Sequence, residues 1–164
     1  MIILVGGGSR SGKSRYALEL ARQRGARPAF LATAQAFDQE MADRIRKHRD
    51  ERGAGFMTWE EPFDVAERLR ANRESDVIVV DCLTLWVSNL MLADREIPAA
   101  DLIAAARSAN ATVIFVSNEV GCGIVPENAL ARRFRDLAGA LNQQVAAAAD
   151  EVYWLAFGIP MKVK

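Results

Sequence analysis

Short apolar runs alternate along the chain with longer stretches in which apolar residues recur at helical spacing. The runs are rich in β-branched and aromatic residues, which favours β-strands at 2–5, 29–33, 76–81, 112–117 and 151–157, with a weaker candidate at 56–60. The stretches of helical period span 13–25, 37–52, 62–73, 83–92, 97–108 and 127–149. Several strands are apolar throughout, as parallel strands are when helices cover both faces of their sheet. The pattern predicts one α/β domain over residues 1–164, with a mainly parallel sheet flanked by helices.

The final "FGIPMKVK" predicts a Gly–Pro turn into a short last strand, and so a C-terminal hairpin. No apolar run approaches the roughly 20 residues that span a bilayer, so we expect no membrane insertion. The N-terminal "MIILVGGG" lacks the basic lead-in of a signal peptide. The spacing of Cys82 and Cys122 fits neither a zinc site nor a disulfide framework. These features predict a soluble protein of the cytoplasm with reduced thiols.

The balance of charged residues argues against one class of function, nucleic-acid binding. Lys and Arg together number 21, as do Asp and Glu, so the formal net charge is zero. A dedicated nucleic-acid-binding protein usually carries a basic excess or patch. We therefore expect no nucleic-acid partner.

The clearest chemical motif follows the first predicted strand. Residues 7–14, "GGSRSGKS", satisfy G-x-x-x-x-G-K-[ST] and open a predicted helix. Glycines let successive backbone N–H groups point at phosphate oxygens, and the positive end of the helix adds to the attraction. Lys13 would reach the β- and γ-phosphates, and the Ser14 hydroxyl would coordinate Mg²⁺. The candidate phosphate-binding residues are Gly7, Gly8, Ser9, Arg10, Ser11, Gly12, Lys13 and Ser14.

A magnesium–nucleotide site usually includes a carboxylate at the end of another buried strand. The run "VIVVD" ends in Asp81, which fits that description. Asp81 would bind Mg²⁺ directly or through water, or else it would only cap the helix that starts at "CLTLW".

Ligands of parallel α/β sheets bind beyond the carboxyl ends of the strands. This rule points to "TAQAFD" at 33–38 and to "SNEVGCGIVPEN" at 117–128. The second loop either faces a substrate or is an irregular surface segment. The arginines of "RRFRD" at 132–136 would hold phosphate or keep a helix soluble, and the solvated face is the simpler interpretation.

The chain has one histidine, His48, within "RIRKHRDERG" at 44–53. It continues an apolar stripe formed by Phe37, Met41 and Ile45, and it also stands in an i, i+4 series with basic residues. A neutral imidazole, with a reference pKa of about 6.5, is a competent nucleophile. Local sequence permits that role without excluding a structural or surface histidine.

Four blocks together resemble one known family. They are "GGSRSGKS" (7–14), "ATAQAFDQEMADRIRKHRDER" (32–52), "VIVVDCLTLWVSNL" (77–90) and the segment from "VSNEVG" to "FGIP" (116–160). In this order they resemble the bifunctional adenosylcobinamide kinase / adenosylcobinamide-phosphate guanylyltransferase family of cobalamin biosynthesis. The resemblance implies a RecA-like P-loop NTPase fold and a homotrimer with active sites near subunit interfaces.

The same resemblance implies two reactions. A nucleoside triphosphate, ATP or GTP, phosphorylates the aminopropanol hydroxyl of adenosylcobinamide. GTP then transfers GMP to adenosylcobinamide phosphate through a guanylylated histidine, giving adenosyl-GDP-cobinamide. The catalytic residues implied are His48, in the block "RI-x-x-HR-x-x-R", and Lys13. Beyond the loop at 7–14, the implied nucleotide contacts are Thr33, Ala34, Gln35, Arg49, Asp50, Glu51, Arg52, Glu60 and Asp81.

Two other functions fit parts of the sequence. Another P-loop small-molecule kinase would use the phosphate loop without guanylyl transfer. A RecA-like nucleic-acid or regulatory ATPase would also carry the loop, but the neutral charge balance argues against it.

Overall fold

The computed structural model describes residues 1–36 and 39–164, so Phe37, at the start of the expected second helix, lies outside the described residues. Within that helix, five further side chains lie outside this description: Glu40, Arg44, Lys47, His48 and Glu51. The strands are β1 (Ile2–Gly7), β2 (Pro28–Ala32), β3 (Met57–Glu60), β4 (Val77–Asp81), β5 (Thr112–Asn118), β6 (Glu151–Ala156) and β7 (Ile159–Lys162). The helices are α1 (Lys13–Arg24), α2 (Gln39–Arg52), α3 (Val65–Ala71), α4 (Leu83–Leu92), α5 (Ala99–Ser108) and α6 (Ala129–Ala148).

The described strands form one seven-stranded sheet in the order β3-β2-β4-β5-β1-β6-β7. Every neighbouring pair is parallel except β6 and β7, which form an antiparallel hairpin. β1 lies between β5 and β6, and β5 separates it from β4. The carboxyl ends of these parallel strands therefore meet at one edge of the sheet, where the phosphate loop begins.

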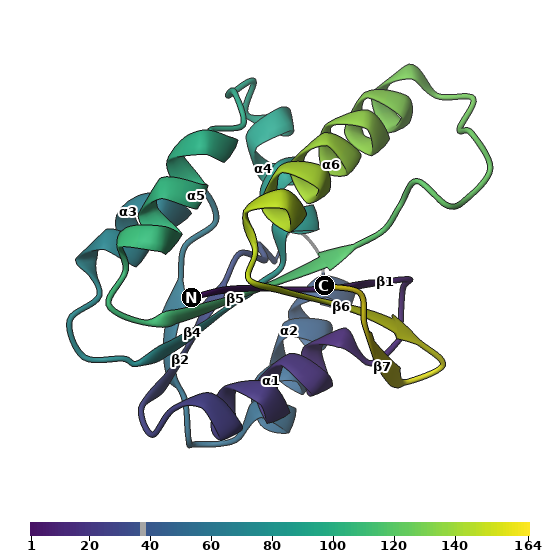
Figure 1. The fold of residues 1–164 in the computed structure, drawn as a ribbon. Helices are drawn as coiled ribbons and strands as arrows, with labels where there is room; N and C mark the ends of the chain where they lie inside the picture. The colour runs from purple at the N-terminus through teal and green to yellow at the C-terminus, as the bar shows by residue number, and fades with distance from the viewer. Residues whose placement is uncertain (37–38) are drawn as a thin grey trace.

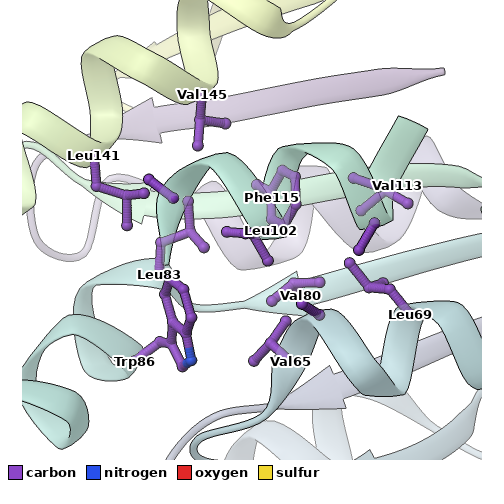
Figure 2. Close-up of a cluster of buried hydrophobic side chains, with 14 of the residues drawn as sticks. Val65, Leu69, Val80, Leu83, Trp86, Leu102, Val113, Phe115, Leu141 and Val145 are labelled. Carbon is purple, nitrogen blue, oxygen red and sulfur yellow. The ribbon is translucent and has the colours of Figure 1, made fainter. Parts of the chain in front are cut away.

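Helices cover both faces of the sheet (Figure 1). Helices α3, α4, α5 and α6 lie on one face, and α1 and α2 lie on the other. Strand residues alternate between the two layers: Ile78 and Val80 pack in the core beneath the first group, whereas Val77 and Val79 pack toward α1. Figure 2 shows the larger core, in which Trp86 and Phe115 are fully buried. Burial on both faces explains why the strand runs are apolar throughout.

A polar contact fixes the far end of α1 to the sheet. Arg24 in the last turn of α1 donates to both carboxylate oxygens of Glu151, at 2.9 and 2.8 Å, and the Tyr153 hydroxyl donates to the same carboxylate at 2.8 Å. Burial acts to raise the pKa of Glu151, but the hydrogen bonds from Tyr153 and Arg24 outweigh it and the pKa is lowered. The contact ties the helix that follows the phosphate loop to β6.

The predicted elements are confirmed, and two details are wrong. The helix expected from residue 62 begins at Val65, because a Glu61 carboxylate oxygen accepts hydrogen bonds from the backbone N–H groups of Phe63 and Asp64. The C-terminal hairpin turns at Phe157 and Gly158, both with positive φ, and not at a Gly–Pro pair. Pro160 instead lies in β7, an edge strand, where proline is tolerated.

Of the helices in the described ranges, none is both long enough and apolar enough to cross a bilayer.

Candidate functional site

The phosphate loop joins the last residue of β1 to the first turn of α1. Gly7 has φ +146°, and a Cβ there would lie 2.6 Å from the backbone oxygen of Leu155 in β6. Gly12 has φ +93°, and its carbonyl accepts the Tyr16 N–H at 3.0 Å to start α1. Both glycines are therefore required by backbone conformation, and at Gly7 by close approach of a second strand as well.

Lys13 folds back over this loop. Its ammonium donates to the Gly8 carbonyl at 2.5 Å and to Ser11 Oγ at 3.4 Å. Burial lowers the pKa of Lys13, and the negative charge of Asp81 opposes that shift. The first turn of α1 contains no acidic residue. An ammonium at the positive end of a helix, with no local carboxylate on that helix, is an arrangement that binds phosphate.

Asp81 is the last residue of β4 and faces this loop from two strands away. Cys82, not Asp81, caps α4: its Sγ accepts the Leu85 N–H at 3.4 Å. The interpretation of Asp81 as only a helix cap is therefore wrong. Burial raises the pKa of Cys82 to about 11, so its thiol stays protonated at neutral pH.

Thr33 fixes the backbone beside Asp81. The side chain of Thr33 is fully buried; its hydroxyl donates to the Cys82 carbonyl at 2.8 Å and accepts the Cys82 N–H at 2.9 Å. The Thr33 N–H donates to the Asp81 carbonyl at 3.2 Å, and Asn89 of α4 donates to the Thr33 carbonyl at 2.8 Å. The structure thus gives the Thr33 side chain a role in positioning the end of β4.

The last turn of α2 brings two arginines to the same edge. Arg49 forms an ion pair with Glu60, at the end of β3, with an N–O distance of 2.5 Å. Arg52 is buried, and its guanidinium lies 4.2 Å from the centre of the Phe30 ring. Burial and the neighbouring Arg49 lower the pKa of Arg52, while Asp81 and Glu60 oppose that shift.

The nucleotide contacts that the resemblance implies therefore form two groups, one at the phosphate loop and one at the last turn of α2. Asp81 acts electrostatically on both groups. Its charge acts on Lys13 of the phosphate loop and on Arg52 of α2. Ser9, Arg10 and Asp50 are exposed, and Ser14, Ala34 and Gln35 are half-buried. His48 belongs to α2 one turn before Arg52, but its side chain and that of Glu51 lie outside the described part of the structure.

The chemistry of the site fits a magnesium–nucleotide complex. Ser14 and Asp81 offer a hydroxyl and a carboxylate, the hard oxygen ligands that Mg²⁺ prefers. Among the described residues, no group of three or more His, Cys, Asp or Glu side chains could hold a metal by itself.

A polar network lies at the end of β5, where the loop 117–128 begins; the sequence pointed to this loop without singling out any of its residues. Ser117 donates to Asn142 Oδ1 at 2.6 Å, and Asn142 donates to the Asn118 carbonyl at 3.2 Å. Thr84 of α4 accepts the Asn118 N–H at 2.8 Å. The signal was the polar "SN" that ends an otherwise apolar strand, at the start of the loop 117–128. The partners in α4 and α6 could not be identified from spacing.

Two of the three arginines in 132–136 contact this loop. Arg135 donates to the Gly121 carbonyl at 2.7 Å, and Arg132 donates to the carbonyls of Pro126 and Glu127 at 2.9 and 2.5 Å. Their role therefore goes beyond keeping the start of α6 soluble, because they tie the loop after β5 to that helix.

Comparison with known proteins decides the family. Residues 3–163 match the family described as cobinamide kinase / cobinamide phosphate guanyltransferase, CobU. The chain belongs to this family. The CobU family member of Salmonella typhimurium, named a bifunctional adenosylcobalamin biosynthesis protein, is 43% identical over 184 aligned residues that include 100% of both chains. A Pseudomonas aeruginosa protein with the corresponding name, CobP, is 42% identical over 98% of this chain and 96% of its own.

Solved structures share the RecA-like α/β fold of the CobU family chain, and the expected fold class is confirmed. The flagellar accessory protein FlaH of Methanocaldococcus jannaschii has a TM-score of 0.62 at 14% identity, covering 99% of this chain and 77% of its own. An ATPase from the type III secretion system of pathogenic bacteria has a TM-score of 0.54 at 13% identity, covering 98% of this chain and 56% of its own. At these identities the likeness concerns the fold.

Proposed function

We propose that this protein is a bifunctional enzyme of cobalamin biosynthesis, acting as an adenosylcobinamide kinase and an adenosylcobinamide-phosphate guanylyltransferase. The match to the CobU family over residues 3–163 carries the proposal. The phosphate loop and the adjoining Asp81 and Arg52 support it, because both reactions use a nucleoside triphosphate. One domain, residues 1–164, holds both activities in a single nucleotide site.

In the kinase step, the loop at 7–14 binds the triphosphate, and the Lys13 ammonium neutralises charge on the β- and γ-phosphates. The adenosylcobinamide hydroxyl attacks the γ-phosphorus and gives up its proton to solvent, the bond to the β-phosphate oxygen breaks, and ADP or GDP leaves. Ser14 and Asp81 would hold Mg²⁺, which when bound neutralises phosphate charge. Phosphoryl transfer needs positioning and charge stabilisation more than covalent chemistry from the protein.

In the guanylyl step, the His48 imidazole attacks the α-phosphorus of GTP. A P–N bond forms, pyrophosphate leaves, and the ring gives up its N–H proton. A phosphate oxygen of adenosylcobinamide phosphate then attacks the same phosphorus. The P–N bond breaks, the imidazole takes up a proton, and adenosyl-GDP-cobinamide is released. Arg49 and Arg52 supply positive charge beside the transferred group, and Thr33, Ala34, Gln35, Asp50, Glu51 and Glu60 complete the nucleotide contacts.

The deciding experiment follows the fate of each phosphate. Protein is incubated with α-labelled or γ-labelled GTP and Mg²⁺, denatured, and tested for an acid-labile label on the chain. We expect α-label on the protein and none from γ-labelled GTP. His48→Ala should remove the adduct and leave phosphorylation of adenosylcobinamide. If α-label never attaches while γ-phosphate is transferred, the protein is a P-loop small-molecule kinase without guanylyltransferase activity.

The proposal extends to assembly and location. We propose that the enzyme works in the cytoplasm with ATP and GTP as substrates. It acts on free corrinoids and has no nucleic-acid partner. We also propose a homotrimer, supported by apolar side chains that the hairpin exposes at Phe157, Ile159 and Met161. Sedimentation equilibrium measures the mass directly, and a mass of one protomer would exclude the trimer.

A further inference from the structure

We propose that Asn118 is a catalytic residue of the phosphate site, and that its side-chain amide donates a hydrogen bond to the terminal phosphate of the bound triphosphate. The inference rests on the proposed function in one respect, because it requires that the loop at 7–14 binds a nucleoside triphosphate.

The sheet places Asn118 between the two parts of the site. β5 lies between β1, which ends in the phosphate loop, and β4, which ends in Asp81. In the register of the sheet, Asn118 is the partner of Gly7, and Val116 is the partner of Asp81. Asn118 is therefore the last residue of β5, the strand that separates the phosphate loop from Asp81.

Strand alternation puts Asn118 on the correct face. Ile114 and Val116 of β5 pack in the core on the α1 side, whereas Val113 and Phe115 pack in the opposite core. Ser117 follows the second pair and bonds to Asn142 of α6. Asn118 continues the alternating series of Ile114 and Val116, and so its side chain lies on the face that carries α1 and the phosphate loop.

The backbone of Asn118 is held from two helices. Thr84 Oγ1 of α4 accepts its N–H at 2.8 Å, and Asn142 Nδ2 of α6 donates to its carbonyl at 3.2 Å. Ser117 fixes the orientation of the Asn142 amide at 2.6 Å. Asn118 itself is half-buried, and within residues 1–36 and 39–164 its carboxamide forms no hydrogen bond. The side chains of Thr84, Asn142 and Ser117 thus fix the position of Asn118. The carboxamide of Asn118 faces the site and has no hydrogen-bond partner among the described residues.

A carboxamide suits this position chemically. Its NH₂ group supplies two N–H donors without adding charge, in a site that already holds Asp81 and would receive a triphosphate. Negative charge spreads over the γ-phosphate oxygens during phosphoryl transfer, and a fixed donor stabilises it. Thr84 and Asn142 act through Asn118 and are positioning residues.

The test compares nucleotides that differ only by the γ-phosphate. Affinities for the α,β-methylene analogues of GTP and GDP are measured by calorimetry with Mg²⁺, because these analogues block attack at the α-phosphorus. Asn118→Ala should weaken binding of the GTP analogue roughly tenfold to a hundredfold and leave the GDP analogue within about twofold. The kinase kcat should fall by a similar factor, with the KM for adenosylcobinamide nearly unchanged.

Two further variants separate a catalytic role from a structural one. Asn118→Asp is nearly isosteric but replaces the donor by an acceptor, so it should lose at least as much affinity for the GTP analogue. Asn110→Ala removes an exposed asparagine just before the opposite end of the same strand and should behave as wild type. Urea unfolding of each variant verifies that it is folded.

The outcomes distinguish this inference from the proposed function. Equal losses for both analogues, no loss for either, or wild-type behaviour of Asn118→Asp would overturn the role of Asn118 and leave the proposed function standing. If the wild-type protein bound neither analogue, both proposals would fail.

Discussion

The Thr33 hydroxyl joins the end of β2 to the end of β4, and replacing Thr33 by valine should destabilise the protein by about 2–4 kcal/mol. Valine fills a similar volume but leaves the buried Cys82 N–H without its acceptor at 2.9 Å. An unsatisfied buried N–H costs about 1–3 kcal/mol. The Cys82 carbonyl loses its bond from Thr33 at 2.8 Å but keeps one from the Trp86 N–H at 3.1 Å, so that loss adds about 1 kcal/mol.

Urea unfolding, followed through tryptophan fluorescence, measures this loss. The midpoint should fall with little change in slope, and the thermal midpoint should drop by about 4–16 °C for a chain of this length. Thr33→Ser is the matched control, because it keeps the hydroxyl and loses only a methyl group. Hydrogen exchange at the Cys82 amide should accelerate in the valine variant and not in the serine variant.

The same variant should also affect the site. Because Thr33 holds the residue after Asp81, Thr33→Val should weaken Mg²⁺-dependent nucleotide binding more than binding measured in EDTA. A Thr33→Val protein as stable as wild type to within about 0.5 kcal/mol would refute the reasoning, since it would show that the two hydrogen bonds contribute nothing net.

Single substitutions at three other positions give further predictions. Gly7→Ala should destabilise by more than about 2 kcal/mol in urea, because its Cβ would lie 2.6 Å from a backbone oxygen of β6, whereas Gly123→Ala meets nothing within 4 Å and should be nearly neutral. Glu151→Gln should cost about 1–3 kcal/mol at pH 7. Since the folded pKa of Glu151 is lowered, its stabilisation is present above the unfolded value of about 4.3 and is lost as the pH falls through the folded value. Wild-type and Glu151→Gln unfolding curves should therefore converge as the pH falls below the unfolded pKa of about 4.3, and a constant difference would contradict the assignment. Lys13→Met should reduce GTP affinity at least tenfold by calorimetry while the urea midpoint holds or rises, because burial of the ammonium opposes its charge.

The elements could be predicted because their apolar pattern is local. β4 reads as a strand from "VIVVD" alone, and the phosphate loop is contiguous in the sequence. The position of Asp81 opposite Lys13 needs one further step, the rule that parallel strands end at the same edge. The family resemblance added Arg49, Arg52 and Glu60, which local spacing would not have selected.

The connections between distant segments could not be predicted. Thr33 and Cys82 are joined through one hydroxyl across two strands, and nothing in either sequence block specifies that bond. Arg52 appears in sequence as one of several surface arginines, yet the structure buries it against Phe30. Such contacts depend on strand order and helix placement, which are set by the whole chain and not by any local pattern.

The central position of β1 has a consequence for how the enzyme is made. β1 is translated first, but its neighbours in the sheet, β5 and β6, come from the last third of the chain. At typical bacterial or eukaryotic rates of about 5–20 residues per second, roughly 7–30 s separate the synthesis of Gly7 from that of Ala156. For all of that interval the apolar strand β1 lacks at least one of its two partner strands, which leaves it exposed to incorrect pairing. The phosphate loop is thus translated before β5 and β6, the two strands that complete its surroundings in the sheet.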